Sequence, residues 1–335
     1  MGFYVHRFVL DLVALGEGHL PRSLGSAIRG AFGNGLRRLV CVEPGTECSA
    51  CPHRSICNYV SIFTPCDAES GNAIPTGFIW QAERRTQNRI STGDTLPIGL
   101  TLIGSAVRYL PYVVYVFRGL HRRGLGKERI PFQLAKVANL SPAGDACTLY
   151  EDGSETIGAP CYPMPALAED AGQAAPVPHG AERVRLEFET PCRLTIGEQL
   201  IIPTTFEAVM RGLFRRLSDL DRYYGEGTLS LDYPAWLRLA AEAHTLRSDL
   251  RWVDIARYSN RQQCKMKMGG FVGRIEFEGP LGPFVPFLRA GEYTHLGKNA
   301  GFGNGRYTMH VLPRQESTQA GDRAEDEFRA SQISE

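Results

Sequence analysis

The chain has 335 residues, of which 43% are hydrophobic and 22% charged, so it can bury two ordinary cores and is neither disordered nor fibrous. It contains no apolar run of the roughly 20 residues that a membrane helix needs, and its first residues lack the features of a secretory signal, so we expect a cytoplasmic protein. The net charge of +1 is uneven: residues 141–182 carry −7 and residues 313–335 carry −3, which leaves +11 on the remainder and favours a polyanionic partner such as nucleic acid.

Residues 1–140 contain the elements of one domain. The run Phe3 to Ala14 is strand-like, and the segment Pro21 to Leu39 carries apolar residues at helical spacing. A turn signal at Ser91–Thr95 separates two strand-like runs that we expect to pair as a hairpin. A further helix and strand complete the order βαββαβ. The hairpin strands are predicted at 78–83 and 96–103, the second helix at 109–120 and the last strand at 132–137.

Cysteines are concentrated after the first predicted helix, in an insertion over residues 41–66. The spacing C-x6-C-x2-C-x5-C is formed by Cys41, Cys48, Cys51 and Cys57. A C-x2-C step lets two thiolates contact one tetrahedral ion, so these cysteines favour a structural zinc site with no open position for catalysis. An iron–sulfur cluster suits the same ligands. Disulfides are the other alternative, and an odd cysteine count in a cytoplasmic chain disfavours them.

The middle and the end of the chain have a different composition. Residues 141–182 are rich in Pro, Gly, Ala and acidic residues, which predicts a linker or a long loop. Residues 313–335 are typical of a disordered tail. The chain is therefore expected to have a second domain over residues 183–312.

That second domain repeats the order βαββαβ. The run Arg183–Glu189 alternates strictly between polar and apolar residues, as a half-buried strand does. The stretch Thr204–Glu207 has the spacing of a capping box and opens a helix with an apolar stripe. The remaining predicted elements are a hairpin of strands 251–259 and 271–278, a helix at 284–290 and a strand at 306–312. Both halves thus predict a ferredoxin-like domain.

A glycine-rich segment, residues 291–307, joins the last helix and strand of the second half. Glycines let backbone N–H groups approach a phosphate closely, and basic residues lie among them. A degraded copy, Leu120–Arg129, occupies the same place in the first half and indicates an internal duplication. The alternative is a tight turn from helix to strand with no ligand.

Several motifs occur in order along most of the chain, together with the four cysteines and the glycine-rich segment. They are Leu24–Gly33, Leu36–Cys41, Tyr59–Phe63, Thr190–Leu194, Phe214–Leu217, Arg257–Gln262 and Gly269–Gly273. In this combination the chain resembles the CRISPR-associated RAMP-superfamily endoribonucleases that process precursor CRISPR RNA, in the subgroup with a cysteine-rich insertion in the first domain.

The resemblance implies tandem ferredoxin-like domains that bind CRISPR repeat or guide RNA across the face between them, with other CRISPR effector subunits as further partners. It also implies cleavage without a catalytic metal. A ribose 2′-OH attacks the adjacent phosphate and leaves a 2′,3′-cyclic phosphate and a 5′-OH. This chemistry needs a base, a group that stabilises charge on the phosphate and an acid.

Histidine is the natural base near neutral pH. The resemblance places the catalytic histidine near the first helix, where this sequence offers only His19 at the helix entry. His295 lies in the glycine-rich segment beside Tyr293 and Lys298, which makes these three the other catalytic candidates. Each histidine has a structural alternative, and such enzymes also cleave by orienting the substrate without a histidine.

Candidate RNA-binding residues come from the basic helix, the second hairpin and the glycine-rich segment. Lys265 and Lys267 are expected on one face of the hairpin, although a solvated basic hairpin is the alternative. The full set is Arg29, Arg37, Arg38, Arg257, Arg261, Lys265, Lys267, Gly297, Gly301, Gly303, Gly305 and Arg306.

Two other functions remain open at the level of sequence. A catalytically silent RAMP subunit that holds guide RNA would keep the basic face without needing a histidine. A zinc or iron–sulfur regulatory protein would centre on the cysteines, but it would leave the duplicated βαββαβ pattern unexplained. Cleavage of repeat RNA in EDTA would distinguish the endoribonuclease from the catalytically silent subunit.

Overall fold

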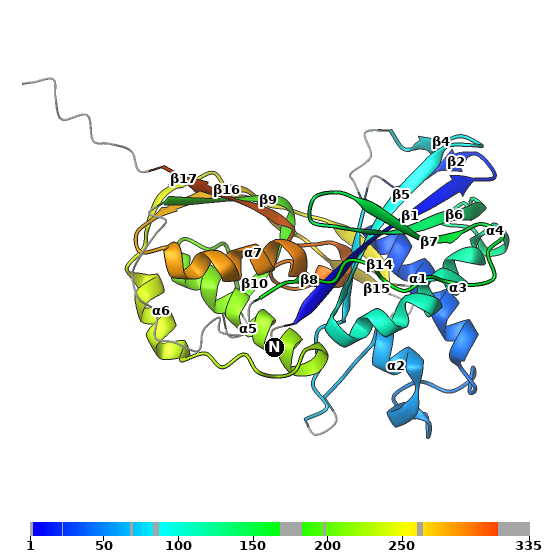
Figure 1. Ribbon diagram of the computed structural model, residues 1–335, viewed down its shortest axis with the longest axis horizontal. Coiled ribbons are helices and arrows are strands. Elements are labelled where there is room, and N and C mark those ends of the chain that lie inside the picture. The colour runs from blue at the N-terminus through cyan, green and yellow to red at the C-terminus, as the bar shows by residue number, and fades with distance from the viewer. Residues whose placement is uncertain are drawn as a thin grey trace, which may run out of the picture.

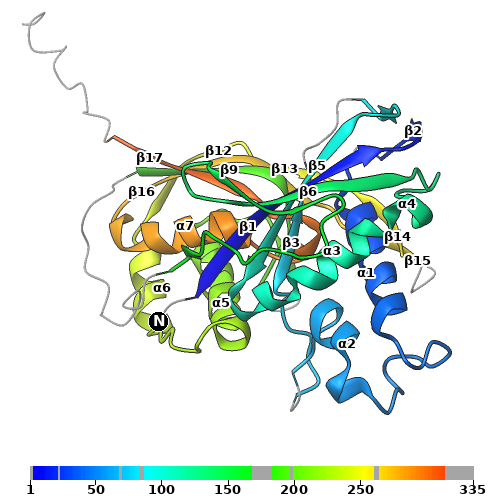
Figure 2. The ribbon, with the colours of Figure 1, turned by 45° about the vertical axis from the view of Figure 1, so that its right-hand side comes forward.

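The computed structural model describes residues 3–21, 23–67, 70–82, 87–167, 183–196, 199–259 and 264–313. Two lobes lie side by side, and each has an antiparallel sheet with helices packed on one face (Figures 1 and 2). Within these residues, none of the helices has the length and apolar composition required to cross a bilayer.

The first domain is built on a sheet of strand order β3-β5-β1-β6-β7, with β8 paired to the start of β1. This order is that of a βαββαβ unit, as predicted, with β7 added at one edge. The strands are β1 (Tyr4–Ala14), β3 (Phe78–Gln81), β5 (Thr95–Ile103), β6 (Phe132–Leu140), β7 (Ala146–Glu151) and β8 (Met164–Pro165), and the short pair β2 (Gly18–His19) and β4 (Arg89–Ile90) lies apart from the sheet. The helices are α1 (Gly25–Val40), η1 (Arg54–Ile56), α2 (Asn58–Phe63), η2 (Gly104–Tyr109), α3 (Leu110–Arg118) and α4 (Leu120–Arg123).

The core of the first domain follows from two periodicities. Alternate residues of β1, from Phe8 to Ala14, are buried on one side of the sheet. Helix α1 covers that side with a stripe of Ile28, Phe32 and Leu36, each at most 1% exposed. A close helix–helix contact is set by Gly35, where a Cβ would lie 2.4 Å from a methyl carbon of Val116.

The second domain has the strand order β12-β16-β9-β17, again that of a βαββαβ unit. Its main helix, α5, begins after Thr205, whose hydroxyl oxygen accepts a hydrogen bond from the N–H of Ala208. The strands are β9 (Arg183–Cys192), β10 (Leu194–Ile196), β11 (Gln199–Ile201), β12 (His244–Ser248), β13 (Arg251–Val253), β14 (Ala256–Ser259), β15 (Cys264–Lys267), β16 (Gly270–Glu278) and β17 (Tyr307–Leu312). The helices are α5 (Phe206–Tyr224), α6 (Tyr233–Ala241), η3 (Gly282–Phe284), α7 (Val285–Thr294) and η4 (Ala300–Phe302).

Two sequence predictions differ from the fold. The single strand predicted at 251–259 is two strands: β13 pairs with β16, whereas β14 pairs with β15 in a separate hairpin. The second strand of the βαββαβ unit is instead β12. Its residues are all exposed and four of its five are polar, so the strand has no alternation of buried and exposed residues that the sequence could reveal. The predicted linker 141–182 contains β7, which extends the first sheet; residues 168–182 and the predicted tail 314–335 lie outside the described residues.

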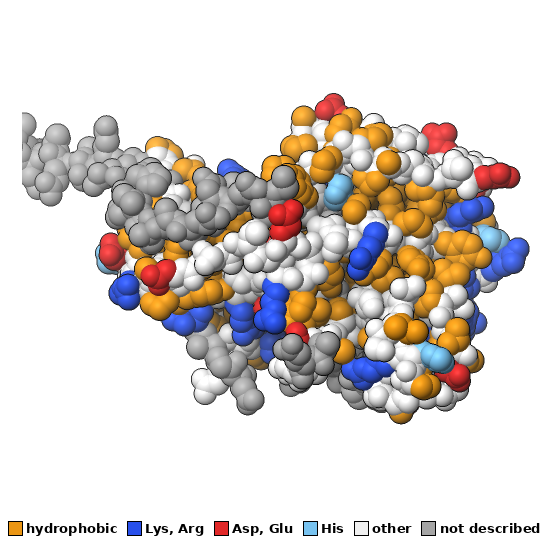
Figure 3. All heavy atoms as spheres, turned by 60° about the horizontal axis from the view of Figure 1, so that its bottom comes forward, with side chains coloured by type: hydrophobic (Ala, Val, Ile, Leu, Met, Phe, Trp, Pro, Cys, Tyr) orange, Lys and Arg blue, Asp and Glu red, His pale blue; other side chains and the backbone are white. Residues whose placement is uncertain are grey.

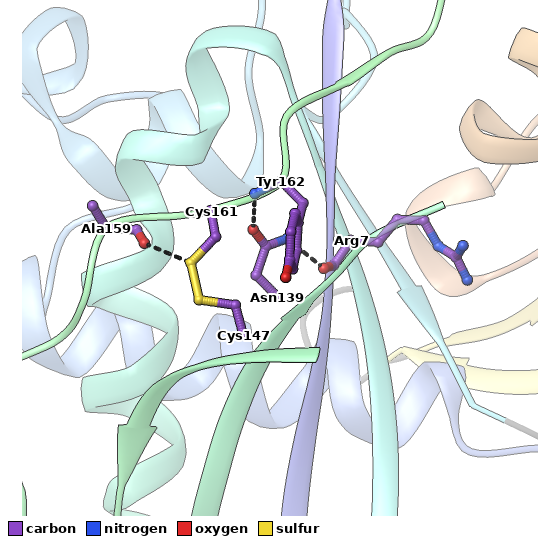
Figure 4. Close-up of a disulfide and its surroundings, with 6 residues drawn as sticks. All are labelled: Arg7, Asn139, Cys147, Ala159, Cys161 and Tyr162. Atoms are coloured by element: carbon purple, nitrogen blue, oxygen red, sulfur yellow. Dashed lines mark hydrogen bonds between the residues drawn. A yellow bond between two sulfur atoms is a disulfide. The ribbon is translucent and has the colours of Figure 1, made fainter. Parts of the chain in front are cut away.

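A disulfide joins Cys147 of β7 to Cys161, which the sequence did not predict (Figure 4). Next to it, the side chain of Asn139 accepts a hydrogen bond from the N–H of Tyr162 and donates one to the carbonyl of Arg7. These contacts hold the segment that leads to β8 against the first sheet.

Candidate functional site

A pocket of about 470 Å³ opens where the two domains meet. It is lined by α1, by the segment 73–76 that precedes β3, by residues 193–195, by one face of α5 and by residues 297–302 of the glycine-rich segment. The first domain supplies the first two of these walls and the second domain the other three. Any ligand of this pocket therefore contacts both domains.

Cations dominate the lining of the pocket. Among the described residues, the lining contains Arg29, Arg193, Arg215, Arg216 and Lys298 against one carboxylate, Asp219. Arg215 and Lys298 are exposed, and neither side chain has a hydrogen-bond or ion-pair partner among the described residues. Free cations beside a concave surface favour an anion with several charges, such as a nucleic-acid backbone.

Arg29 is held between two aromatic rings. Its guanidinium carbon lies 4.1 Å from the ring centre of Phe63 and 4.3 Å from that of Phe302, and its Nη2 donates to the carbonyl of Phe63. Phe63 belongs to α2 in the first domain and Phe302 to the second domain. The clamp fixes the guanidinium in the pocket wall and joins the two domains.

A polar stripe on one face of α5 lines the pocket. Its residues are spaced i, i+3, i+4 and i+7, which places them on one side of the helix: Gly212, Arg215, Arg216 and Asp219. Arg216 Nε donates to the carbonyl of Thr294 at 2.8 Å, and burial lowers the pKa of its guanidinium to about 10. Burial also raises the pKa of Asp219, while Arg215 and Arg216 oppose that shift. The stripe therefore stays net positive near neutral pH.

The glycine-rich segment is pressed against the first domain. A Cβ on Gly303 would lie 2.5 Å from the carbonyl oxygen of Trp80, and one on Gly301 would lie 2.8 Å from Thr76 Oγ1. The N–H groups of residues 296, 298, 302, 303, 305 and 306 already donate to protein acceptors. The glycines of this segment allow close packing and tight turns. Because these N–H groups are already bonded, we expect side chains such as Lys298, more than the backbone, to bind phosphate.

His295 is fully buried. Its Nδ1 donates to the carbonyl of Asn304 at 3.1 Å, and its Nε2, 3.1 Å from Gln81 Nε2, accepts from that amide. Burial, helped by nearby Arg216, lowers the pKa of His295 to about 3. The ring is therefore neutral and shielded from solvent, which argues against a role as a base and for a role in fixing the glycine-rich segment to β3.

His19 lies on β2 and is exposed. Its Nδ1 is 3.5 Å from Glu128 Oε1, and its backbone N–H donates to the same carboxylate at 2.9 Å. An accessible imidazole oriented by a carboxylate suits a general base. The short strand β2 lies at the opposite end of the first domain from α5 (Figures 1 and 2). The structure thus separates His19 from the inter-domain pocket.

The other predicted residues of the second domain lie in different settings. Tyr293 faces Arg7 of β1, whose guanidinium carbon is 6.0 Å from its ring centre. Arg306 forms an ion pair with Glu189 at 3.0 Å. On the hairpin β14–β15, Arg257 pairs with Met266, while Lys265 and Lys267 occupy alternate positions of β15. This hairpin reaches toward α1 in both views (Figures 1 and 2). Arg261 lies outside the described residues.

The last turn of α1 does not contribute to the pocket. Arg37 donates to the carbonyl of Thr46, and a hydrogen bond to Cys41 raises the pKa of its guanidinium. Arg38 is exposed on the far side of the helix, near Arg123 of α4. Of the three basic residues predicted on α1, only Arg29 lines the pocket.

The cysteine-rich insertion contains the thiols predicted to bind zinc. Cys41, Cys48, Cys51 and Cys57 are all free thiols, and thiolates are ligands that zinc prefers. Within the described part of the chain, however, no three His, Cys, Asp or Glu side chains lie close enough together to hold a metal ion. Cys66 instead accepts a hydrogen bond from Arg54 Nη2 at 3.2 Å. The thiol donors suit zinc, and the zinc site stays a prediction.

Sequence reasoning missed several residues of the site. Arg193 and the pair Arg215 and Arg216 were not selected, although the i, i+3, i+4, i+7 stripe that contains Gly212 and Asp219 was readable in the helix sequence. Glu128 was also missed, because its contact with His19 spans 109 positions and leaves no local signal.

The second domain is similar in sequence to a known protein family. A family described as "CRISPR-associated endoribonuclease Cas6" matches residues 186–307. Residues 186–307 of the second domain are thus similar to this family. A different family, AF_1859_N, described as an N-terminal domain, matches residues 3–161. The Cas6 match covers β9 to the start of β17, including the polar stripe of α5 and the glycine-rich segment.

Solved Cas6 structures share the fold. A chain of a "Partial Cas6-RT-Cas1--Cas2 complex" superposes with a TM-score of 0.56 over 93% of this chain at 11% identity, and this chain spans 47% of that chain. A Cas6 product complex gives a TM-score of 0.52, at 14% identity over 92% of this chain and 99% of that one. Thermus thermophilus Cas6 gives 0.50, at 14% identity over 92% and 100%. At such identities the similarity concerns the arrangement of both domains and not their activity.

A curated relative is found in Archaeoglobus fulgidus. It is described as an uncharacterized protein and is 24% identical over 293 residues, which cover 87% of this chain and 93% of the relative. The similarity extends over both domains.

Proposed function

We propose that this protein is a Cas6-type endoribonuclease that cleaves CRISPR repeat RNA and releases guide RNA. The observation that carries the proposal is that the domain similar to Cas6 and the first domain together form a pocket with two exposed cations, Arg215 and Lys298, that have no partner within the part of the chain that the structure describes. An RNA strand across this pocket would place its phosphates between the two domains.

The proposed reaction needs no metal ion. A base removes the proton of a ribose 2′-OH, the 2′-oxygen bonds to the adjacent phosphorus, and the bond from phosphorus to the 5′-oxygen breaks. An acid protonates the leaving 5′-oxygen, so the products are a 2′,3′-cyclic phosphate and a 5′-OH. A cation or hydrogen-bond donor beside the scissile phosphate would stabilise the charge that develops on it. Lys298 and Arg215 would hold other phosphates of the same strand in the inter-domain pocket.

We assign the base to His19, because it is exposed and is oriented by Glu128, whereas His295 is buried. Its separation from the inter-domain pocket requires that the RNA extend along the first domain. The alternative is cleavage by orientation of the 2′-OH without a histidine.

A second function has one specific observation in its favour. The histidine of the glycine-rich segment is neutral and buried, as expected of a subunit that holds guide RNA without cutting it. Other CRISPR effector subunits would then be its partners. The structural zinc remains a separate prediction that metal analysis of the purified protein would test.

The test is incubation of cognate repeat RNA with the wild-type protein and with an Arg215→Gln/Lys298→Gln variant, in buffer with EDTA. Cleavage by the wild type, and its loss in the variant, is the expected result. Tight binding without cleavage would move the protein to the guide-holding class. Absence of binding would refute both functions.

A further inference from the structure

Two turns of this chain have the same backbone shape, one in each domain. In the first domain α4 ends at Gly124, with φ 67° and ψ 168°, and in the second α7 ends at His295, with φ 57° and ψ 164°. Each of these residues is followed by a buried leucine, Leu125 or Leu296. Both helices therefore reverse through the same unusual conformation and insert the next side chain into the core of their own domain.

The equivalence continues beyond the leucine. Gly126 has φ 79° and Gly297 has φ 83°, a region that favours glycine. Each leucine N–H donates to a carbonyl two residues before the fourth strand of its βαββαβ unit. The acceptor is Ile130 before β6 and Gly305 before β17. The residue after each glycine is an exposed lysine: Lys127 is the structural counterpart of Lys298.

We propose that the turn Gly124–Ile130 is a second phosphate-binding site, which contacts the same RNA through Lys127. This inference rests on the proposed function, because it extends the RNA path from the inter-domain pocket to the far end of the first domain. Since Glu128 orients His19, the residue next to Lys127 is in contact with the proposed base.

The charges around this turn support an anionic ligand. The side chains of Arg38, Lys127 and Arg129 have no hydrogen-bond or ion-pair partner within the described residues. Arg38 lies close enough to Arg123 to lower the pKa of that guanidinium, an effect second to burial. Figure 3 shows blue and pale-blue side chains together at the right-hand edge, on the side where α4 lies in Figure 1. Repulsion between these cations is relieved when a phosphate binds.

An RNA backbone fits better than an acidic protein surface because an aromatic side chain accompanies the arginines. Tyr115 of α3 is 60% exposed and close enough to Arg123 to affect its pKa. Exposed rings beside cations provide stacking surfaces for unpaired bases. In the described part of the chain, the first-domain turn has no segment equivalent to η4, and its exposed Lys127 precedes Glu128, whose carboxylate contacts His19.

The experiment compares Lys127→Gln with the wild type on two RNAs, the repeat alone and the repeat extended by spacer sequence on both sides. Dissociation constants are measured over a series of salt concentrations. At least one of the two RNAs should extend to the turn. We expect the variant to bind that RNA about three- to tenfold more weakly at low salt, and the slope of log K against log salt to be smaller in magnitude by about 0.7. The Lys298→Gln variant should show a similar change. In the double variant the two fold-changes in affinity should multiply and the two changes in slope should add.

Arg238→Gln is the matched control, because Arg238 is an exposed arginine on α6 in the other domain and has no side-chain partner among the residues that the structure describes. The proposal is overturned if Lys127→Gln binds both RNAs with the affinity and salt slope of the control while Lys298→Gln is impaired. If Lys127→Gln loses binding to anionic lipid vesicles that the wild type binds, while its RNA binding is intact, the turn belongs to a membrane surface and the proposal is overturned as well. If the wild type itself binds neither RNA, the proposed function fails too, so the two failures are distinguishable.

Discussion

The side chains of Gln81 and His295 meet across the domain boundary, with their Nε2 atoms 3.1 Å apart. Gln81 ends β3 in the first domain, and His295 directly follows α7 within the glycine-rich segment of the second. Because the amide donates and the imidazole accepts, the bond requires a neutral ring. One hydrogen bond thus couples the position of the glycine-rich segment to the protonation of a buried histidine.

Acid should therefore weaken the folded state through His295. Its folded pKa of about 3 lies below the ordinary value of 6.5, so the unfolded chain binds the proton first, and stability is complete above pH 6.5 and falls as the pH drops toward 3. We expect this group alone to remove about 2 kcal/mol of unfolding free energy between pH 7 and pH 5. Denaturant titrations at the two pH values measure the loss.

The matching variant is His295→Gln, with the exposed His310→Gln as its control. His295→Gln should be less stable at pH 7 by about 1–3 kcal/mol, because Gln81 and Asn304 lose a partner. Its stability should then depend less on pH than that of the wild type. An unchanged pH dependence in this variant would show that the histidine is not the group responsible.

Neutralising either exposed cation of the pocket should weaken RNA binding. Arg215→Gln and Lys298→Gln are each expected to cost about tenfold in affinity at low salt, which corresponds to one lost charge-assisted contact. Filter-binding titrations at several salt concentrations provide the measurement. Equal affinities for Arg215→Gln and the Arg238→Gln control would place the RNA elsewhere.

Removal of the imidazole of His19 should slow cleavage without weakening binding. We expect His19→Ala to reduce the single-turnover rate by about 10²–10⁴-fold, the contribution of a general base. Glu128→Gln should reduce it less, since the carboxylate acts through the ring. His310→Ala serves as the control. A rate within a few-fold of wild type for His19→Ala would leave orientation of the 2′-OH as the source of catalysis.

The Cys147–Cys161 disulfide should stabilise the first domain. Its sequence separation is 14 residues, for which the loss of loop entropy in the unfolded chain corresponds to about 3 kcal/mol. Reductant should lower the melting temperature of the wild type. It should have no such effect on Cys161→Ser, because this variant cannot form the disulfide. Identical melting curves for the wild type with and without reductant would contradict the pairing.

The sequence predicted those parts of the fold that depend on local periodicity. The alternation in β1 and β9 and the apolar stripes of α1 and α5 specified two βαββαβ units, and the strand orders agree with them. β12 was missed because all its side chains are exposed, so it has no buried face to create a pattern. β7 was hidden by the acidic, proline-rich composition of the segment around it.

The site was less predictable because its geometry depends on contacts distant in sequence. Burial of His295 results from the approach of β3, more than 200 positions away, and no local pattern signals it. The partner of His19 is 109 positions distant. By contrast, the duplicated Leu-Gly-Lys sequence is recognisable from the sequence alone. The backbone angles were needed to show that the two turns have the same conformation.

The most direct test is to incubate the protein with its cognate repeat RNA in EDTA and to determine the chemistry of the new ends. We predict a single cut that leaves a 2′,3′-cyclic phosphate on one fragment and a 5′-OH on the other. Cleavage only when a divalent metal is supplied, or fragments with a 3′-OH and a 5′-phosphate, would contradict attack by the 2′-OH and with it the proposed enzyme.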